Sequence, residues 1–408
     1  MNSEMKNAGK SVFWSLCVMG GLMILSSTMS KSGSVLSTFS KSLGTPDVWT
    51  GLVLSASTIP GILVSLPAAS LSDIYGRKRF LLLAGVIFAS APFLYLLVTD
   101  WRQLVLVRFY HGFATAIFVP VAEATIAELF PKKLGERISL FTSATYVGRI
   151  IAPALGGYLL FATGQDFHQV YLAVAAAGVT GLITAIPFLA GKEKQTRRSE
   201  ESIGKVFKRM FSGWKEIAKN GGALVVSFVQ SSQYYVFGAF DFYLAEYMIF
   251  GLGYNTLGQG LIASSVLAVA IFARPFMGRV SDRIGRRIPI ISGSILSALA
   301  MITVPFVADF TTLVVLLVIY GFGFATVTSS TTPLICDLMP QEFVGTSMGF
   351  LDTTMDIGQT LGGFISGAVF ATSLHYTAVF LSFGIVLLLS CIMFAALRIG
   401  KNHTTQSR

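Results

Sequence analysis

Charged side chains are scarce in this sequence. They make up 12% of the 408 residues, whereas hydrophobic residues make up 53% and the mean hydropathy is +0.70. A soluble globular protein must cover its surface with polar groups, so this balance excludes an ordinary soluble domain. The net charge of +10 would suggest nucleic-acid binding in a soluble protein. Here the basic residues lie mostly at the ends of apolar segments, which indicates a membrane protein with no nucleic-acid partner.

Cysteines are few, and nucleotide-binding motifs are lacking. Cys17, Cys336 and Cys391 lie inside apolar runs without metal-ligand spacing, and their odd number argues against a disulfide framework. We interpret them as small core residues. No Gly-x-x-x-x-Gly-Lys-[Ser/Thr] loop is present, so nothing indicates an ATPase. We expect no enzyme activity, no cofactor and no metal site.

Long apolar runs, by contrast, are abundant. A membrane-spanning helix needs roughly 20 apolar residues, and the sequence predicts an all-α membrane protein with twelve transmembrane helices. The polar start, Met1–Lys10, precedes a run that is too long for a signal-peptide core and lacks a cleavage site, so we expect a retained first helix. The predicted spans are Ser11–Phe39, Val48–Leu71, Phe80–Thr99, Leu104–Phe130, Ile138–Ala162, Val170–Ala190, Ala223–Phe250, Leu257–Val280, Ile288–Val307, Leu313–Leu338, Gly345–Phe370 and Thr377–Leu397.

Basic residues are nearly absent from alternate connections. With the N-terminus inside, the outer connections hold only Lys41 and Arg102. The positive-inside rule then predicts cytoplasmic N- and C-termini in a multi-pass protein of the inner (cytoplasmic) cell membrane. We expect a six-helix bundle at 1–190 and a second at 221–408, which ends in a short cytoplasmic tail. A basic cytoplasmic linker at 191–220 would join them, with an amphipathic helix on the inner leaflet.

One short hydrophilic motif occurs twice. Asp73-Ile-Tyr-Gly76-Arg77-Lys78 joins the second and third spans, and Asp282-Arg-Ile-Gly285-Arg286-Arg287 joins the eighth and ninth. The two aspartates are 282 − 73 = 209 residues apart, which is half the chain. A single copy would be weak evidence, but two copies in register predict a duplicated membrane protein with two pseudo-symmetric six-helix bundles.

The duplication extends beyond these loops. Glu128-Leu-Phe-Pro131 follows the fourth span, and Asp337-Leu-Met-Pro340 follows the tenth at the same spacing of 209. A glycine-rich segment from Gly148 to Gly157 then matches the segment from Gly358 to Gly367, with one inserted residue.

The arrangement resembles the major facilitator superfamily over essentially the whole chain. The loop signature of the family is Gly-x-Leu-[small]-Asp-[basic]-x-Gly-[basic]-[basic]. The first copy has Ala69 for the leading glycine and Ile74 for the first basic residue, and the second, from Gly278, is fuller. Such loops would form a cytoplasmic latch and conformational switch, in which carboxylates pair with guanidinium groups and release them when the inside opens. The alternative is that they only anchor helix ends among the lipid headgroups.

Two further motifs are similar to those of the twelve-helix drug:proton antiporter branch. Arg108-Phe-Tyr-His111-Gly112 in helix 4 resembles Arg-x-x-Gln-Gly, with histidine in place of glutamine. Gly148-Arg149-Ile-Ile-Ala152-Pro153-Ala-Leu-Gly156-Gly157 in helix 5 resembles Gly-x-x-x-Gly-Pro-x-x-Gly-Gly, with Ala152 in place of a glycine. The resemblance implies that helix 5 seals the two halves against leak. Close packing, as in any polytopic protein, is the alternative.

Ionisable residues inside a membrane are costly and therefore functional candidates. The resemblance implies that Arg108 helps to govern proton coupling, and an outward-snorkelling arginine is the alternative. His111 lies one turn deeper on the same face, where we favour a neutral hydrogen-bonding histidine over a proton carrier. Glu123 in helix 4 and Arg149 in helix 5 are expected to pair with each other, or else to serve substrate or protons.

Other charges lie in helices 1, 7 and 11. Lys31 and Asp241 are nearly equivalent in the repeat, where an opposed pair would close the outer side or contact cargo, and simple exposure in the outer vestibule is the alternative. Asp352 and Asp356 lie one turn apart, so repulsion favours a proton on one of them. Asp356 is the leading proton-carrier candidate of the second half, although a pair with a hydroxyl or arginine is equally plausible. The carboxylate that many antiporters carry in helix 1 is lacking here.

Helix 7 carries a polar and aromatic stripe. Gln230, Gln233, Tyr234 and Phe237 recur at helical spacing, and Asp241 continues the same face. We expect this face to line a cavity that suits an amphipathic or cationic cargo. Ordinary core packing would produce a similar stripe.

These features predict a secondary active transporter that works by alternating access and uses a proton gradient to export a hydrophobic or cationic small molecule. The alternative is a proton symporter for an organic anion or other metabolite, with Lys31, Arg108 and Arg149 as the positive site. A non-transporting membrane receptor on the same fold is less favoured. We expect a monomer whose partners are the small-molecule substrate, protons and the lipid bilayer.

Overall fold

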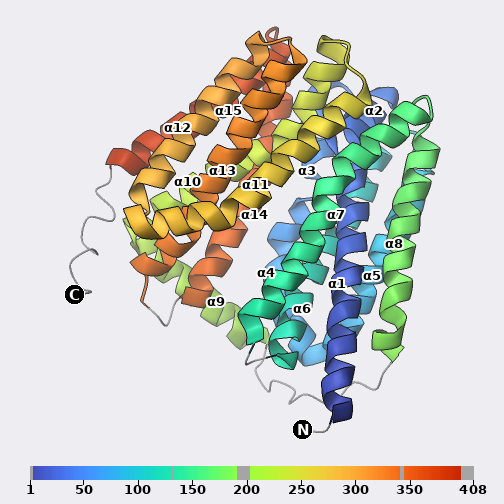
Figure 1. Cartoon of the computed structure of the whole chain (residues 1–408), viewed down its shortest axis with the longest axis vertical. Helices are drawn as coiled ribbons and strands as arrows, with labels where there is room; N and C mark the ends of the chain where they lie inside the picture. The colour runs from blue at the N-terminus through green and yellow to red at the C-terminus, as the bar shows by residue number, and fades with distance from the viewer. Residues whose placement is uncertain (1–2, 131–132, 191–202, 341–343, 397–408) are drawn as a thin grey trace. The chain divides into compact units, whose positions relative to one another are not determined.

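The computed structural model describes residues 3–130, 133–190, 203–340 and 344–396, and all regular structure in these segments is helical. Figure 1 shows the helices in chain order. Their bounds are α1 (Ser3–Lys31), α2 (Gly33–Ser42), α3 (Asp47–Ser55), α4 (Ile59–Tyr75), α5 (Arg77–Tyr95), α6 (Trp101–Leu129), α7 (Leu134–Ala162), α8 (Phe167–Ala190), α9 (Ile203–Lys219), α10 (Gly221–Ala245), a π-helical turn (Glu246–Gly251), α11 (Thr256–Ile284), α12 (Arg287–Thr303), a 3-10 turn (Val304–Phe306), α13 (Phe310–Leu338), α14 (Val344–Phe370) and α15 (His375–Ala396).

Ten spans within the described residues are long and apolar enough to cross a membrane. Helices α10 and α14, of 25 and 27 residues, are long enough but lie outside this group. With them the described chain has the twelve spans that the sequence predicts. Polar residues lower the hydropathy of these two helices, and they include the candidate site residues Gln230, Gln233, Asp352 and Asp356.

The first two predicted spans are each divided by a break. The span predicted as Ser11–Phe39 is interrupted at Ser32, whose extended backbone separates α1 from α2. The span predicted as Val48–Leu71 is divided by turn residues 56–58, and Pro60 is the second residue of the helix that follows. Because proline has no N–H group to donate, it is favoured at the start of a new helix and disfavoured inside a continuing one.

The chain packs into two compact units. The first contains Met1–Thr45, Ala56–Val206 and Gly253–Ser264, and the second contains Pro46–Ser55, Phe207–Leu252 and Ser265–Arg408. Each unit therefore includes one short segment from the other half of the sequence: α3 packs in the second unit, and the start of α11 packs in the first.

Corresponding helices pair in the same way in both units. In the first unit α1 packs on α7, α5 on α6 and α5 on α8, and in the second α10 packs on α14, α12 on α13 and α12 on α15. This correspondence is the structural form of the sequence repeat, and it confirms two pseudo-symmetric bundles.

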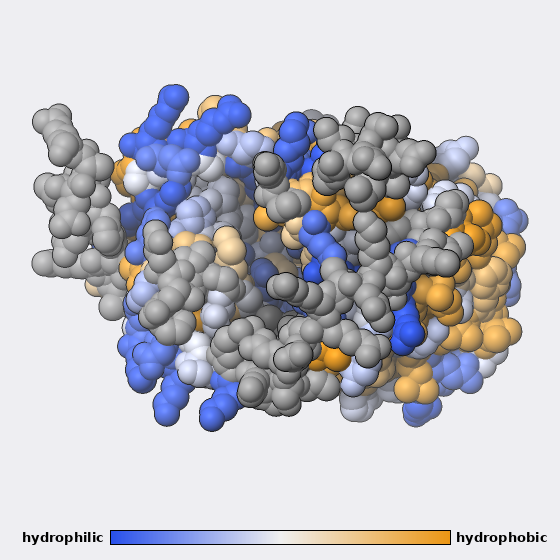
Figure 2. Space-filling view, turned by 90° about the horizontal axis from the view of Figure 1, so that it is seen from below, coloured by the Kyte–Doolittle hydropathy of each residue, from blue (hydrophilic) through white to orange (hydrophobic). Residues whose placement is uncertain are grey.

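Apolar side chains serve both the cores and the flanks. The core of the first unit contains fully buried Phe13, Phe88 and Phe118, and that of the second contains Ile217 and Ile290. Figure 2 views the protein from below, where hydrophilic residues form clusters and hydrophobic residues gather along one edge. This distribution suits a protein that is surrounded by lipid.

The predicted linker helix is present as α9. Its C-terminal part packs in the second unit, where the ring of Trp214 lies 5.8 Å from that of Phe350 and Ile217 is fully buried. Lys208 and Lys215 are exposed. The rest of the predicted linker, residues 191–202, lies outside the described residues.

Side-chain caps mark several helix starts. Asp309 accepts hydrogen bonds from the amide and the hydroxyl of Thr312, each at 2.8 Å, at the start of α13. These hydrogen bonds to the carboxylate lower the pKa of Asp309 below its ordinary value. Asn220 caps α10 in the same manner through the amide of Ala223.

Glycine at 362 permits the contact between α14 and α10, because an added Cβ atom would collide with the carbonyl of Tyr235. We expect Gly362→Val to lower the thermal unfolding midpoint in detergent by about 3–8 °C, since backbone cannot yield as a flexible side chain would. Gly278→Val in α11 is the matched control, because no described atom lies within 4 Å of its Cβ position. Equal midpoints for the two variants would contradict this packing.

Candidate functional site

The two hydrophilic motifs form equivalent turns. Gly76, between α4 and α5, has a φ of 104°, and Gly285, between α11 and α12, has a φ of 87°. Side chains rarely tolerate this backbone region, which explains why glycine occupies both positions. Each turn places the following arginine one helical turn beyond an aspartate.

Arg77 links three helices of the first unit. Its Nε atom donates to Oδ1 of Asp73 at 3.0 Å, and its Nη1 atom lies 3.1 Å from Oε2 of Glu128 and also donates to the carbonyl of Ala124. The side chain of Arg77 is 22% exposed, so these charge-assisted contacts are only partly screened by solvent. They tie the end of α4 and the start of α5 to α6.

Arg286 forms the matching network in the second unit. It pairs with Asp282, and its Nε atom lies 3.7 Å from Oδ2 of Asp337 in α13. Asp337 stands in register with Glu128, so the repeat of the sequence reappears as two equivalent ion-pair networks. These described pairs each lie within one unit, and the latch between the halves stays a prediction. Arg287 adds a hydrogen bond of 2.7 Å to the carbonyl of Ala395 in α15.

The glycine-rich segment of α7 begins against α1. A Cβ atom at Gly148 would collide with the carbonyl of Gly21. At Gly156 a Cβ atom would lie 2.9 Å from the side chain of Val35 in α2. The helices therefore approach each other backbone to backbone, as small residues permit in membranes.

The same segment then meets the start of α11 within the first unit. A Cβ atom at Gly157 would collide with the carbonyl of Thr256, whose hydroxyl donates to the Gly157 carbonyl at 2.9 Å. The carbonyl of Pro153 lies against Gly260 just as closely. Beside this proline, the amide of Ala154 donates to the hydroxyl of Ser264 at 3.0 Å. Few and neutral hydrogen bonds hold this contact.

The second unit repeats both approaches. A Cβ atom at Gly358 of α14 would collide with the carbonyl of Ser231 in α10, and one at Gly367 would lie 2.6 Å from the amide of Gly51 in α3. In addition, the hydroxyl of Ser55 donates to the carbonyl of Thr360 at 2.7 Å.

Helix α6 buries an arginine in the first unit. Arg108 is 1% exposed, and its Nη2 atom donates to the hydroxyl of Ser57 at 2.9 Å. Ser57 lies in the break between α3 and α4. One turn along α6, a Cβ atom at Gly112 would collide with the carbonyl of the same serine. The broken second span is thus fitted closely to α6 at Arg108.

His111 joins this buried polar cluster. Its Nδ1 atom lies 3.4 Å from the hydroxyl of Tyr95 and 3.5 Å from that of Ser30. The ring of Tyr95 stacks on that of Tyr171, with centroids 4.5 Å apart and planes 5° apart. Four helices, α1, α5, α6 and α8, contribute to the cluster. Its imidazole and hydroxyl groups can donate or accept protons, and its arginine supplies a fixed positive charge.

A family model described as Major Facilitator Superfamily matches residues 16–258 and 226–407 of the chain. The chain belongs to the Major Facilitator Superfamily. It is a membrane transporter and not an enzyme.

Similar proteins cover most of the chain. An uncharacterized MFS-type transporter of Methanocaldococcus jannaschii is 26% identical over 357 residues, which are 85% of this chain and 89% of that protein. The multi-drug resistance efflux pump PmrA homolog of Lactococcus lactis is 24% identical over 327 residues, 80% and 79% of the two chains. The crystal structure of a bacterial homolog to the human lysosomal transporter Spinster has a TM-score of 0.76 at 15% identity and covers 95% of both chains, which shows the shared fold.

Other predicted site residues of this Major Facilitator Superfamily protein lie in or beside its spans. Lys31 is exposed at the end of α1. Four other residues are half-buried: Lys78, Glu123, Arg149 and Asp241. The pairing of Glu123 with Arg149, and of Lys31 with Asp241, stays a prediction.

The polar residues of α10 and α14 have different surroundings. Thr331 of α13 donates to Oε1 of Gln230 at 2.5 Å. Gln233 is fully buried, and neither of its amide atoms has a hydrogen-bond partner in the part of the chain that the structure describes. On α14, Asp352 is exposed and Asp356 is half-buried.

Sequence reasoning missed charged residues inside the predicted spans of the second unit, among them Glu246, which is 3% exposed, and Arg274. Arg274 of α11 donates from Nη2 to the hydroxyl of Tyr234 at 3.2 Å, and its Cζ atom lies 5.5 Å from the centroid of the Phe324 ring. The position of Arg274 inside the span predicted as Leu257–Val280 could have identified it, because the same kind of position identified Arg108 as a candidate.

The two ion-pair networks should differ in the coupling energy between their arginine and the more distant carboxylate. In double-mutant cycles with Arg77→Gln and Glu128→Gln, followed by thermal unfolding in detergent, we expect a coupling of about 0.5–1 kcal/mol, because the pair is partly exposed. The longer pair, Arg286 with Asp337, should couple more weakly. Arg79→Gln is the control for Arg77, since Arg79 is exposed on the same helix. Coupling of Glu128 to Arg79 as strong as to Arg77 would refute the network.

Proposed function

We propose that this transporter exports hydrophobic small molecules in exchange for protons by alternating access. The main support for this proposal is a matched pair of glycine contacts. In one, α7 meets the start of α11, and in the other, α14 meets α3. In each contact the chain of one partner segment continues into the other unit, and the residues described above at these contacts are neutral. Such contacts can separate without exposing an unpaired charge to lipid, which a transporter with two alternating states requires.

The names of relatives support export. The PmrA homolog of Lactococcus lactis and PmrA of Streptococcus pneumoniae, each 24% identical, are described as multi-drug resistance efflux pumps. Basic residues concentrated in alternate connections support cytoplasmic termini in the cell membrane. We propose that one chain suffices for transport.

One half-buried carboxylate supports proton coupling. Asp356 is half-buried in α14, where protonation would remove a costly charge. In the first unit Arg108 holds the break in the second span through Ser57. We assign the proton to Asp356, and Arg108 to positioning of α3 and α4.

The arginine at 274 favours a second candidate, proton symport of an organic anion. The two candidates differ in the direction of cargo movement. In inside-out membrane vesicles acidified inside, an antiporter drives the neutral dye Nile red into the lumen, whereas a symporter drives preloaded anion out. No response of either cargo to the gradient would refute proton coupling.

The role of Asp356 predicts a selective loss. We expect Asp356→Asn to slow gradient-driven dye uptake at least about 10-fold while leaving dye exchange without a gradient intact, because a permanently neutral side chain cannot release a proton. The control is Glu136→Gln, since Glu136 is an exposed carboxylate at the start of α7. If Asp356→Asn pumps at the wild-type rate, another group carries the proton.

A further inference from the structure

An aromatic cluster from two helices holds Arg274 inside the second unit. Tyr234 of α10 accepts its hydrogen bond at 3.2 Å, and the Phe324 ring of α13 lies 5.5 Å from its Cζ atom. Phe324 stacks on Phe237 of α10, with centroids 4.7 Å and planes 13° apart. One phenol and one aromatic face thus orient the guanidinium group.

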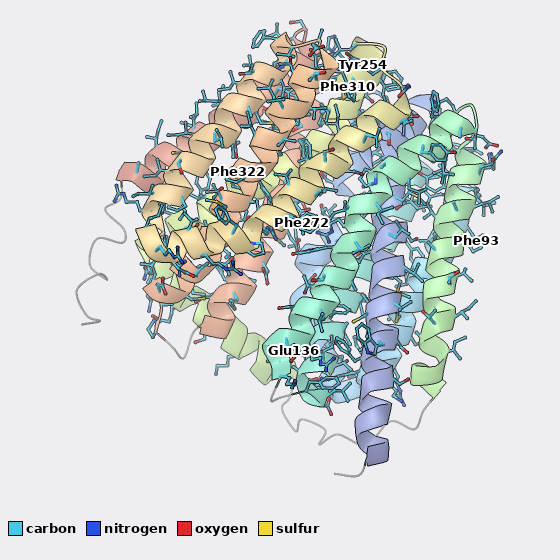
Figure 3. The ribbon with its side chains drawn as sticks, viewed as in Figure 1. Phe93, Glu136, Tyr254, Phe272, Phe310 and Phe322 are labelled. Carbon is cyan, nitrogen blue, oxygen red and sulfur yellow. The ribbon has the colours of Figure 1, made fainter. Side chains whose placement is uncertain are left out.

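Helix geometry directs Arg274 toward these rings and away from the flank. Phe272 and Phe276 of α11 are 74% and 60% exposed, and Figure 3 labels Phe272 on that helix. Each is two residues from Arg274, which is about 200° around an α-helix. The two phenylalanines therefore occupy the outer face of α11, and Arg274 occupies the face that meets α10 and α13.

The cluster lies deep in the span. Arg274 precedes the end of α11 at Ile284 by roughly 15 Å of helix. Tyr234 and Phe324 lie near the middle of their helices. An ionisable residue at this depth is a functional candidate. Arg274, Tyr234 and Phe237 are each half-buried.

We propose that Arg274, Tyr234 and the Phe237–Phe324 stack bind the anionic group of an amphipathic aromatic compound. The planar guanidinium fork matches a carboxylate or sulfonate, and the stacked rings receive an apolar ring system. This inference rests on the proposed transport function and names the class of its cargo. It holds for either direction of transport.

The test uses three compounds with one ring system and different charge: 1-naphthoate, 1-naphthylmethanol and 1-naphthylmethylamine. Binding to the purified full-length protein in detergent is measured by equilibrium dialysis. We expect naphthoate to bind about 10-fold more tightly than the neutral alcohol. Arg274→Gln should abolish that preference, and Tyr234→Phe should reduce naphthoate affinity about 3-fold. The matched control is Arg279→Gln, since Arg279 is exposed on the same helix.

Several results would overturn the site. These are equal affinities for naphthoate and alcohol, tighter binding of the amine, or an unchanged preference in folded Arg274→Gln. Displacement of naphthoate by phosphatidylglycerol, but not by excess benzoate, would identify a lipid headgroup site instead. If Arg274→Gln does not fold, Arg274→Lys decides, because it keeps the charge and loses the fork. Wild-type naphthoate affinity in Arg274→Lys would then refute the guanidinium contact.

The binding and transport results separate the two proposals. Gradient-driven movement of Nile red without a preference for naphthoate would refute the anion site and leave proton-coupled export standing. A preference that depends on Arg274, with no cargo moved by any gradient, would support the site and refute export.

Discussion

The energetic penalty on charge in hydrocarbon organises this protein. Most of its basic residues stand at helix ends, where lipid headgroups and water solvate them. Two arginines in the interior are held by other side chains: Arg108 by Ser57, and Arg274 by Tyr234 and Phe324. The same penalty favours helix contacts that are made through glycine and neutral hydroxyl groups.

The glycine contacts and the terminal ion pairs act on different parts of the helices. The ion pairs of Arg77 and Arg286 tie neighbouring helix ends within a unit. The contacts at Gly157 and Gly367 involve segments whose chains continue into the other unit. In the proposed mechanism a unit keeps its own helices together while such a segment is released.

Sequence repetition predicted much of this scaffold because duplicated residues have duplicated surroundings. The spacing of 209 located both positive-φ glycines and placed Glu128 and Asp337 in register, and both now contact an arginine. Hydropathy predicted the spans but not the breaks at Ser32 and residues 56–58, because it does not register backbone direction. It also could not pair Arg274 with Tyr234, since the rotation of α11 against α10 depends on packing across three helices.

The interior chemistry, unlike the scaffold, does not follow the repeat. The position 209 residues after Arg108 is Leu317, which is fully buried in α13, and the position 209 residues before Arg274 is Ser65 in α4. A duplicated chain begins with equal halves, so a buried arginine that is present in only one half reflects a local requirement and not the fold. Symmetric elements, the loops and glycines, suit the motion that both halves share. In the proposed mechanism the unmatched arginines, one beside a broken helix and one beside stacked rings, serve the separate tasks of positioning that break and binding cargo.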